Sequence, residues 1–320
     1  MLHDDLSESG IEQEGNMVQT EKRRPWKVNA DAGRYVSVLS DAGFKAVFGG
    51  ERNTDVLLDL LNAVLPAERR VHGVNYNTAE IPGLTVDGKT GRFDLCCTDV
   101  FDGTTYIIEV QNYWQRNFFK RCVDYAAKVY DLQARRGDGG QYDIPPVYLI
   151  GILGKDEMFD RSDERWADRF ISRNTVMDRG TGLIHCETIN LTFVDVYRFG
   201  KELKDCHSVE DRWCYALKHG NEFREIPVEL DSEEFRRFFR ACEIAGFDEM
   251  QRFKYEKDMI TDKDWLNIQL SAEERGFDRG VFEGEAEAKA EIARNMKIRG
   301  LAGQLISEVT GLTPEEVASL

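Results

Sequence analysis

The spacing of apolar residues changes along the chain and predicts where helices and strands lie. Leucines at helical spacing in residues 56–65 predict a buried helix that ends at Pro66, and a shorter helix is predicted to begin near Ser40. The continuous apolar run of residues 147–154 is typical of a buried strand, and residues 185–199 predict another strand, with a helix between the two. This order of elements predicts a mixed α/β layer.

Residues 116–136 predict an amphipathic helix, because their apolar side chains recur every three or four positions. The predicted apolar face consists of Phe119, Cys122, Val123, Ala126, Val129 and Tyr130. Glycines directly after this segment end the predicted helix.

Charged helical patterns dominate from about residue 205 onward. Residues 232–247 predict one amphipathic helix, and residues 265–299 predict a much longer one. The long helix carries three glycines on one face: Gly276, Gly280 and Gly284. Such a face permits close approach of a partner helix, and the alternative is a solvated helix that frays.

The last twenty residues predict two short helices. The second begins with a capping box of Thr313 and Glu316, with Pro314 at the first helical position. This unit is compatible with a helix-turn-helix, but its acidic sequence is a poor match for DNA phosphates. We therefore expect it to serve assembly or packing.

Composition and pattern together divide the chain into three expected regions. Residues 1–29 are charged, lack apolar periodicity and are expected to form a flexible acidic tail. Residues 30–225 are expected to form the α/β domain, and residues 226–320 a helical C-terminal region.

A predicted hairpin raises the central question of this sequence. Residues 91–114 read as two apolar strands and a polar turn, yet Asp94 and Glu109 lie inside the strands. If Asp102 and Gly103 form a two-residue turn, opposed residue numbers sum to 205, so Asp94 faces Gln111.

Alternation then places the polar side chains of Asp94, Glu109 and Gln111 on one face, within about 5–8 Å of one another. The other face is apolar and consists of Phe93, Leu95, Cys97, Tyr106, Ile108 and Val110.

Two carboxylates at such a separation repel each other unless they are solvated, one is protonated, or a cation lies between them. Mg²⁺ suits the third case, because it binds one or two carboxylates, retains waters and takes further oxygens from a phosphate. A metal held in this way activates water for attack on a phosphoryl group. The alternative is a hairpin with one wet face, on which Asp94 and Glu109 are simply solvated.

The most basic helical stretch follows the second strand directly, so it can lie beside these carboxylates. Residues 112–136 contain two acidic residues and the basic residues Arg116, Lys120, Arg121, Lys128, Arg135 and Arg136. The alternative is an ordinary charged helix surface. The net charge of −16 weighs against nucleic acid as a partner, but it is a sum over the chain and does not exclude a local site.

Cysteine usage and hydropathy bear on location. The seven cysteines include no C-x-x-C pair, their number is odd and no secretory signal precedes them. We therefore expect reduced thiols in a cytoplasmic protein. The longest apolar run is far too short to span a bilayer, so no membrane association is expected.

Several segments resemble one known family. An Asp, a hairpin and Glu-x-Gln resemble the two-part acidic motif of the PD-(D/E)XK nucleases, in which the last position is usually Lys. The segments "SDAGFKAVFGG", "VLLDLLNAVL", "FDLCCTDVFDGTTYIIEVQ" and "RCVDYAAKVYDLQ" resemble successive elements of the Rpn family of PD-(D/E)XK nuclease family transposases. "ISEVTGLTPEEVASL" resembles its C-terminal end. The resemblance implies a restriction-endonuclease-like PD-(D/E)XK core, with a mixed central sheet flanked by helices, and an α-helical C-terminal region.

The same resemblance assigns roles to individual residues. Asp94 and Glu109 become the metal-binding acids, and Gln111 takes the place of the usual Lys as the third catalytic position. Asp41 corresponds to an acid that adds a metal ligand or orients water, although an N-terminal helix cap is the alternative. Gln111 cannot supply a cation, and Lys45 is a candidate to do so. Candidate contacts to the DNA backbone are Lys45, Arg116, Lys120, Arg121 and Lys128.

The carboxylates and the basic helix predict a DNA endonuclease that depends on Mg²⁺ or Mn²⁺ and binds DNA with little sequence specificity. The resemblance implies an association with recombination or transposon-like elements. Cutting both strands needs two sites, which is compatible with a homodimer. The alternative is a catalytically degenerate nuclease fold that acts as an interaction protein through its helical C-terminus. Metal binding at the hairpin separates the two functions.

Overall fold

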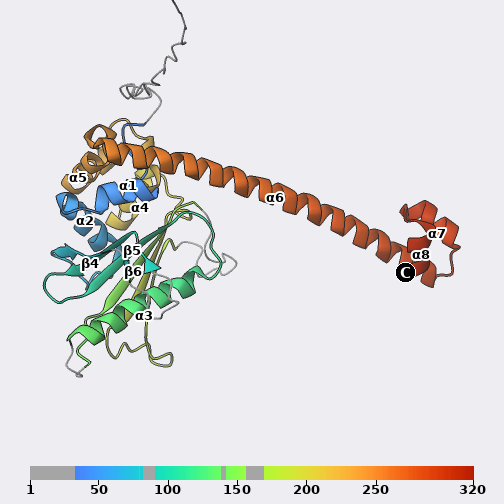
Figure 1. Cartoon of the computed structure of the whole chain (residues 1–320), viewed down its shortest axis with the longest axis horizontal. Helices are drawn as coiled ribbons and strands as arrows, with labels where there is room; N and C mark the ends of the chain where they lie inside the picture. The colour runs from blue at the N-terminus through green and yellow to red at the C-terminus, as the bar shows by residue number, and fades with distance from the viewer. Residues whose placement is uncertain (1–32, 79, 82–90, 138–141, 156–168) are drawn as a thin grey trace, which may run out of the picture. The chain divides into compact units, whose positions relative to one another are not determined.

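A computed structural model describes residues 33–78, 80–81, 91–137, 142–155 and 169–320 (Figure 1). The expected tail, residues 1–29, lies outside these ranges. A mixed six-stranded sheet forms the centre, in the order β1-β4-β5-β6-β8-β7. Its strands are β1 (Val74–Tyr76), β4 (Leu95–Asp99), β5 (Thr105–Gln111), β6 (Val147–Leu153), β7 (Ile171–Thr175) and β8 (Ile189–Asp195). Strands β5, β6 and β8 run parallel, and the remaining neighbours pair antiparallel.

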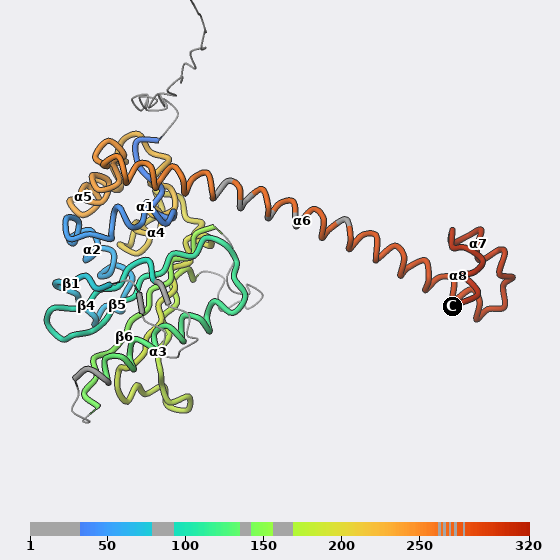
Figure 2. Tube along the Cα trace, viewed as in Figure 1, coloured from blue at the N-terminus to red at the C-terminus, as the bar shows by residue number. Residues whose placement is uncertain are grey.

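Helices cover both faces of this sheet, as the path of the chain in Figure 2 makes visible. One face carries α1 (Asp41–Phe48), α2 (Thr54–Val64), α4 (Val209–His219) and α5 (Glu233–Cys242), and the other carries α3 (Phe118–Gly137). Short 3₁₀ turns connect them: η1 (Glu51–Asn53), η3 (Leu203–Asp205), η4 (Gly220–Glu222), η5 (Val228–Leu230) and η6 (Ile244–Gly246). The predicted mixed α/β fold is therefore confirmed.

The large core lies between the sheet and the four-helix face. Trp213 of α4 packs against Phe235 and Phe238 of α5, and Phe238 also stacks on Phe48 of α1. Helix α5 thus shares one core with the helices that precede it. The expected division near residue 225 does not correspond to a division of this core.

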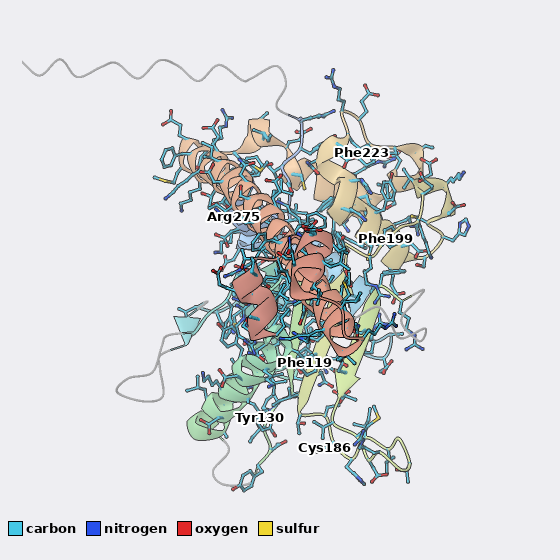
Figure 3. All side chains as sticks on the ribbon, turned by 90° about the vertical axis from the view of Figure 1, so that its right-hand side faces the viewer. Phe119, Tyr130, Cys186, Phe199, Phe223 and Arg275 are labelled. Atoms are coloured by element: carbon cyan, nitrogen blue, oxygen red, sulfur yellow. The ribbon has the colours of Figure 1, made fainter. Side chains whose placement is uncertain are left out.

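A smaller core lies beneath α3, which runs along the sheet between Phe119 and Tyr130 in Figure 3. The buried positions of the helix are Phe118, Cys122, Ala126 and Val129, whereas Phe119 and Val123 are exposed. The predicted face was therefore wrong at Phe119 and Val123. The helix begins at Phe118, and the side chain of this residue contacts Phe193 of β8.

The turn between β4 and β5 is longer than the sequence predicts. Leu95 pairs with Ile108 and Thr98 with Thr105, so opposed residue numbers sum to 203 rather than 205. The N–H of Asp99 donates to the Thr104 carbonyl at 2.8 Å, which closes a loop of residues 100–103. A shift of two residues preserves which strand residues share a face, because side chains alternate with period two.

The chain bends at Asp94, and this bend corrects a second detail of the hairpin. Phe93 lies in the core beneath α3 with Ile107, whereas Leu95 lies in the large core with Ile108. The sequence placed Phe93 and Leu95 on the same face. Residues Gly91–Arg92 instead form β3, which pairs with β2 (Glu80–Ile81) in a separate two-stranded sheet.

The region between β6 and β8 differs from the expected helix. Strand β7 occupies part of it and pairs antiparallel with β8, while residues 156–168 lie outside the described ranges. Strand β7 is only partly buried, and its sequence is therefore mostly polar. It has no apolar run that would predict a strand.

The C-terminal region begins with α6 (Glu249–Ile298), which starts well before the expected residue 265. Asp248 and Gln251 form its capping box, and this signal marks the true N-terminus. Helices α7 (Gly303–Thr310) and α8 (Pro314–Ser319) pack on Ala293 and Met296 through Ile306 and Val317. The predicted capping box of Thr313 and Glu316 is present.

All seven cysteines are unpaired, and six of them are buried. Cys186 is exposed in the connection between β7 and β8 (Figure 3). Within the described part of the chain, no helix combines the length and apolar character needed to cross a bilayer.

Candidate active site

The candidate site lies at the C-terminal end of β5, next to the bend at Asp94. Strand β5 alternates between the two cores, with Ile107 beneath α3 and Ile108 in the large core. Glu109 therefore points toward α3, and it is only 8% exposed. Gln111 faces the same side, because its Oε1 atom lies 2.8 Å from Nη2 of Arg121 on α3.

The Asp94 side chain occupies a different position from the one expected. Its Oδ2 atom accepts a hydrogen bond of 2.7 Å from the N–H of Val110, in the place where a continued β4 would supply a carbonyl. The bend thus turns this carboxylate along the edge of β5 toward α1, so Asp94 does not share a simple sheet face with Glu109. The two residues remain adjacent, because the N–H of Asp94 donates to Oε2 of Glu109 at 3.3 Å.

Both carboxyl groups have pKa values above their ordinary range. Burial first, and then the charge of Asp94, raise the pKa of Glu109 to about 7, although Arg121 acts in the opposite direction. Burial also raises the pKa of Asp94 to about 6, with further effect from the Asp41 carboxylate, while the Val110 N–H lowers it. The simple wet face that was the alternative does not describe these residues, because Glu109 is buried and Asp94 nearly so.

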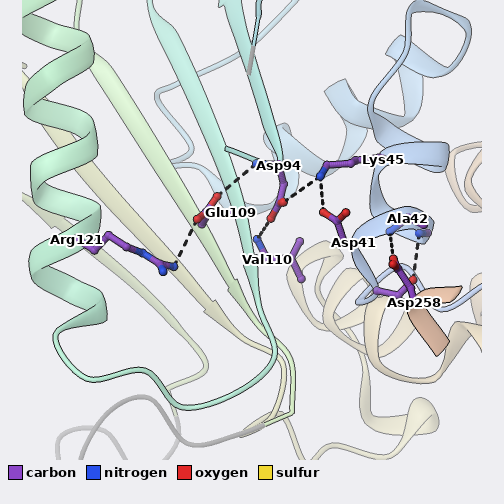
Figure 4. A network of polar contacts seen from close by, with 10 residues as sticks. Asp41, Ala42, Lys45, Asp94, Glu109, Val110, Arg121 and Asp258 are labelled. Carbon is purple, nitrogen blue, oxygen red and sulfur yellow. Dashed lines mark hydrogen bonds and ion pairs between the residues drawn. The ribbon is translucent and has the colours of Figure 1, made fainter. Parts of the chain in front are cut away.

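Two cations flank the pair, one on each side (Figure 4). Nζ of Lys45 on α1 lies 3.7 Å from Asp94 and 2.5 Å from Asp41. Nη2 of Arg121 lies 3.4 Å from Oε1 of Glu109. The structure therefore brings together Asp94, Glu109, Gln111, Asp41, Lys45 and Arg121.

Asp41 is not the N-cap of α1. Ser40 caps this helix by accepting a hydrogen bond from the N–H of Gly43, and Asp41 is the first helical residue. The Asp41 side chain is more than half exposed and is paired with Lys45. Asp41 and Asp94 both line a cavity that is open to solvent, so the Asp41 carboxylate is accessible to a ligand bound beside Asp94.

A cavity of about 280 Å³ opens beside Asp94 and is lined in part by residues that the sequence analysis missed. Asp258 and Thr261 of α6 contribute to its wall, as do Asn112 and Tyr113 after β5. The carboxylate of Asp258 accepts a hydrogen bond from the N–H of Ala42 at the N-terminus of α1. No local sequence pattern predicts this contact, because the two residues are 216 positions apart.

The other candidate contacts to DNA lie on α3 or just before it, outside this cluster. Arg116 and Lys120 are exposed near its N-terminal end. Lys128 is paired with Asp124 at 2.6 Å, which offsets its charge.

The residues present fit a hard divalent cation. Among the described residues, no group of three or more His, Cys, Asp or Glu side chains is arranged around a metal position. Mg²⁺ does not need such a group, because it retains waters and takes substrate oxygens beside one or two carboxylates. Asp94 and Glu109 supply oxygen donors. Burial is the main cause of their raised pKa values, with a further contribution from the charge of Asp94 on Glu109, and a bound cation would favour the charged form of both.

Comparison with known families agrees with this geometry. Residues 38–272 match the family described as PD-(D/E)XK nuclease family transposase. The chain belongs to this family. The match covers the sheet, all the helices around it and the first part of α6. No curated protein and no solved structure shows a significant match to the chain.

The C-terminal end matches a second family. Residues 286–320 match the C-terminal helix-turn-helix domain of the Rpn/YhgA-like nuclease family. This match includes the end of α6 together with α7 and α8. A helix-turn-helix is therefore the interpretation that the match supports, in place of the expected role in packing or assembly.

Proposed function

We propose that this member of the PD-(D/E)XK nuclease family transposases is a metal-dependent endonuclease that hydrolyses phosphodiester bonds in DNA. The observation that carries the proposal is the adjacent pair of carboxylates, Asp94 and Glu109, of which Asp94 lines a cavity that is open to solvent. A structural sheet gains nothing from this pair, because each charge raises the free energy of the other.

Asp94 and Glu109 would hold the metal, and Asp41 would add a carboxylate from α1. When bound, the metal would lower the pKa of a water molecule and stabilise charge on the phosphoryl group. Gln111 would orient water or a phosphate oxygen by hydrogen bonding. Water adds to phosphorus, one phosphorus–oxygen bond to a sugar breaks, and the departing oxygen takes a proton.

DNA is the proposed partner, and two features support it. Arg116 and Lys120 offer exposed positive charge at the N-terminal end of α3, and the C-terminal helix-turn-helix domain is a second module of a type that binds DNA. The net charge of −16 favours weak binding that falls steeply with salt. Association with recombination or transposition, and a homodimer that cuts both strands, remain parts of this proposal.

The test is plasmid nicking by the full chain with Mg²⁺, Mn²⁺ or chelator. The parent should nick only with metal, and Glu109→Gln and Asp94→Asn should each nick at least about 100-fold more slowly. Glu229→Gln alters an exposed carboxylate on η5 and should nick at the parent rate.

Calorimetric titration with Mn²⁺ distinguishes the nuclease from the alternative, a catalytically degenerate nuclease fold that acts as an interaction protein. The departure from Lys at Gln111 is the observation that favours a degenerate scaffold. A parent chain that neither nicks DNA nor binds Mn²⁺ at Asp94 and Glu109 would refute the nuclease and support the scaffold.

A further inference from the structure

Position 111 lacks the charge that the PD-(D/E)XK motif usually has there. Gln111 lies two residues after Glu109 on β5, and both side chains face α3. A Lys at this position would extend from the same side of the strand. The neutral amide of Gln111 can orient a group but cannot stabilise negative charge as a cation does.

Arg121 brings a cation to this place from a different element. Its Nη2 atom lies 2.8 Å from Oε1 of Gln111. The same atom lies 3.4 Å from Oε1 of Glu109 (Figure 4). The Glu109 carboxylate in turn accepts a hydrogen bond from the backbone N–H of Asp94. The guanidinium is thus connected to every residue of the acidic motif through a single chain of hydrogen bonds.

The surroundings of Arg121 hold the guanidinium in position. Its central carbon lies 5.0 Å from the ring centre of Phe118 and 5.8 Å from that of Tyr125, on the preceding and following turns of α3. Phe118 is buried against the sheet. The Arg121 side chain is only 28% exposed, whereas Arg116 and Lys120 nearby belong to the exposed residues.

Lys45 is the other candidate for the missing charge, and it lies on the wrong side. It contacts Asp94 and Asp41, so two carboxylates share its charge. It comes from α1, on the face opposite to α3. The side chain of a Lys at position 111 would reach toward Arg121 rather than toward Lys45.

We propose that Arg121 is a positioning residue of the site, which holds Glu109 and Gln111 in place and supplies the positive charge that a Lys at position 111 would supply. This inference rests on the proposed nuclease function, and it replaces the expected role of Arg121 as a contact to the DNA backbone. The guanidinium donates hydrogen bonds and carries positive charge, so the contribution of Arg121 is electrostatic and does not include proton transfer.

The test compares Arg121→Ala, Arg121→Lys and the double variant Gln111→Lys/Arg121→Ala with the control Arg179→Ala. Each full-length variant is measured for single-turnover nicking at saturating DNA, and for metal-free affinity to a labelled duplex by fluorescence anisotropy. Arg121→Ala should nick about 100-fold more slowly with a Kd for DNA within about twofold of the parent. Arg121→Lys should retain about a tenth of the parent rate, because a point charge replaces the planar fork.

The double variant is the decisive arm. Gln111→Lys/Arg121→Ala restores a cation beside Glu109 from the strand, so it should nick at least about tenfold faster than Arg121→Ala. Arg179→Ala removes an exposed arginine between β7 and β8 and should match the parent in both measurements. If Arg121→Ala weakens metal-free DNA binding and leaves the saturated rate unchanged, or if the folded double variant recovers nothing, the proposal is overturned.

Mn²⁺ titration separates this proposal from the nuclease function itself. Removal of a positive charge beside Glu109 should tighten Mn²⁺ binding about threefold to tenfold, and the double variant should return it to the parent value. If the three proteins show these relative Mn²⁺ affinities but the parent does not nick DNA, the nuclease function alone would be refuted. Equal Mn²⁺ affinity in all variants would overturn the role of Arg121.

Discussion

At the scale of single residues, the site depends on a conflict between two carboxylates. Asp94 and Glu109 could be paired from the sequence, because both interrupt apolar strands and the period of two places them close together. The direction of the Asp94 side chain could not be predicted. It depends on a bend and on a hydrogen bond to Val110, and neither leaves a mark in the hydrophobic pattern.

This conflict makes the stability of the metal-free protein depend on pH. The pKa values of Glu109 and Asp94, raised from 4.5 and 3.8 to about 7 and about 6, mean that the folded chain binds these protons more tightly than the unfolded chain. The associated stability is fully present below about pH 4 and is lost as pH rises to about 7. Relative to the parent, Glu109→Gln should therefore gain about 1–3 kcal/mol in unfolding free energy between pH 5 and pH 8.

Urea unfolding at the two pH values, with chelator present, measures this change. The matched control is Glu229→Gln, whose difference from the parent should be the same at both pH values. A Glu109→Gln variant whose difference from the parent is also constant would mean that the Glu109 carboxyl has an ordinary pKa in the folded chain.

At the scale of elements, amphipathic helices and buried strands were predictable because burial imposes their period. The turn after β4 was not, since the Asp-Gly pair fits both a two-residue turn and the end of a four-residue loop. The start of α6 was missed for a different reason. The first turns of α6 are charged and half exposed, so its apolar pattern is weak there, and the capping box at Asp248 is the signal that could have located it.

The four-residue loop gives Gly103 a specific structural role. Its φ of 75° is in the left-handed region, and an added Cβ would lie 3.1 Å from Cγ of Pro145. Gly103→Ala should lower the unfolding free energy by about 1–3 kcal/mol, from backbone strain and crowding together. Urea denaturation measures the loss.

The matched control is Gly182→Ala, which has a similar φ of 71° but open space around the added atom. It reports backbone strain alone and should cost less than Gly103→Ala. Equal losses would show that Pro145 moves aside at no cost.

At the scale of the whole molecule, the sequence predicted a nuclease core and a helical C-terminal region, but not where one ends. The expected boundary near residue 225 followed a change in composition. The folded core continues through α5 into α6. The Tyr255 hydroxyl of α6 accepts a hydrogen bond from the N–H of Ser37, and the Asp258 carboxylate accepts one from the N–H of Ala42 at the N-terminus of α1. Contacts between such distant residues depend on the three-dimensional arrangement and have no period that a sequence could display.

Two truncations test this revised boundary. Deletion of residues 273–320 leaves Tyr255 and Asp258 in place, so the chain should fold and should nick at the parent rate per site when DNA is saturating. It should bind DNA more weakly and self-associate less, because the helix-turn-helix domain and the open glycine face of α6 are removed. Deletion of residues 249–320 should also lower the unfolding free energy, by about 1–3 kcal/mol, since two hydrogen-bonded contacts to the N-terminal part of the core are lost.

Nicking, sedimentation and urea denaturation of the two truncated chains provide the measurements. If the shorter chain is as stable as the longer one, the first turns of α6 contribute nothing to the core. If the longer one folds but does not nick, the catalytic unit extends beyond residue 272.

The distribution of thiols has one further consequence. Cys186 alone is exposed, so an alkylating reagent should modify it at once and the other six cysteines only when the chain opens. Cys122 adjoins Arg121 in sequence and is fully buried between α3 and the sheet. The rate at which Cys122 is alkylated under native conditions therefore measures how often α3 separates from the sheet. The same rate reports how often the guanidinium of Arg121 leaves Glu109.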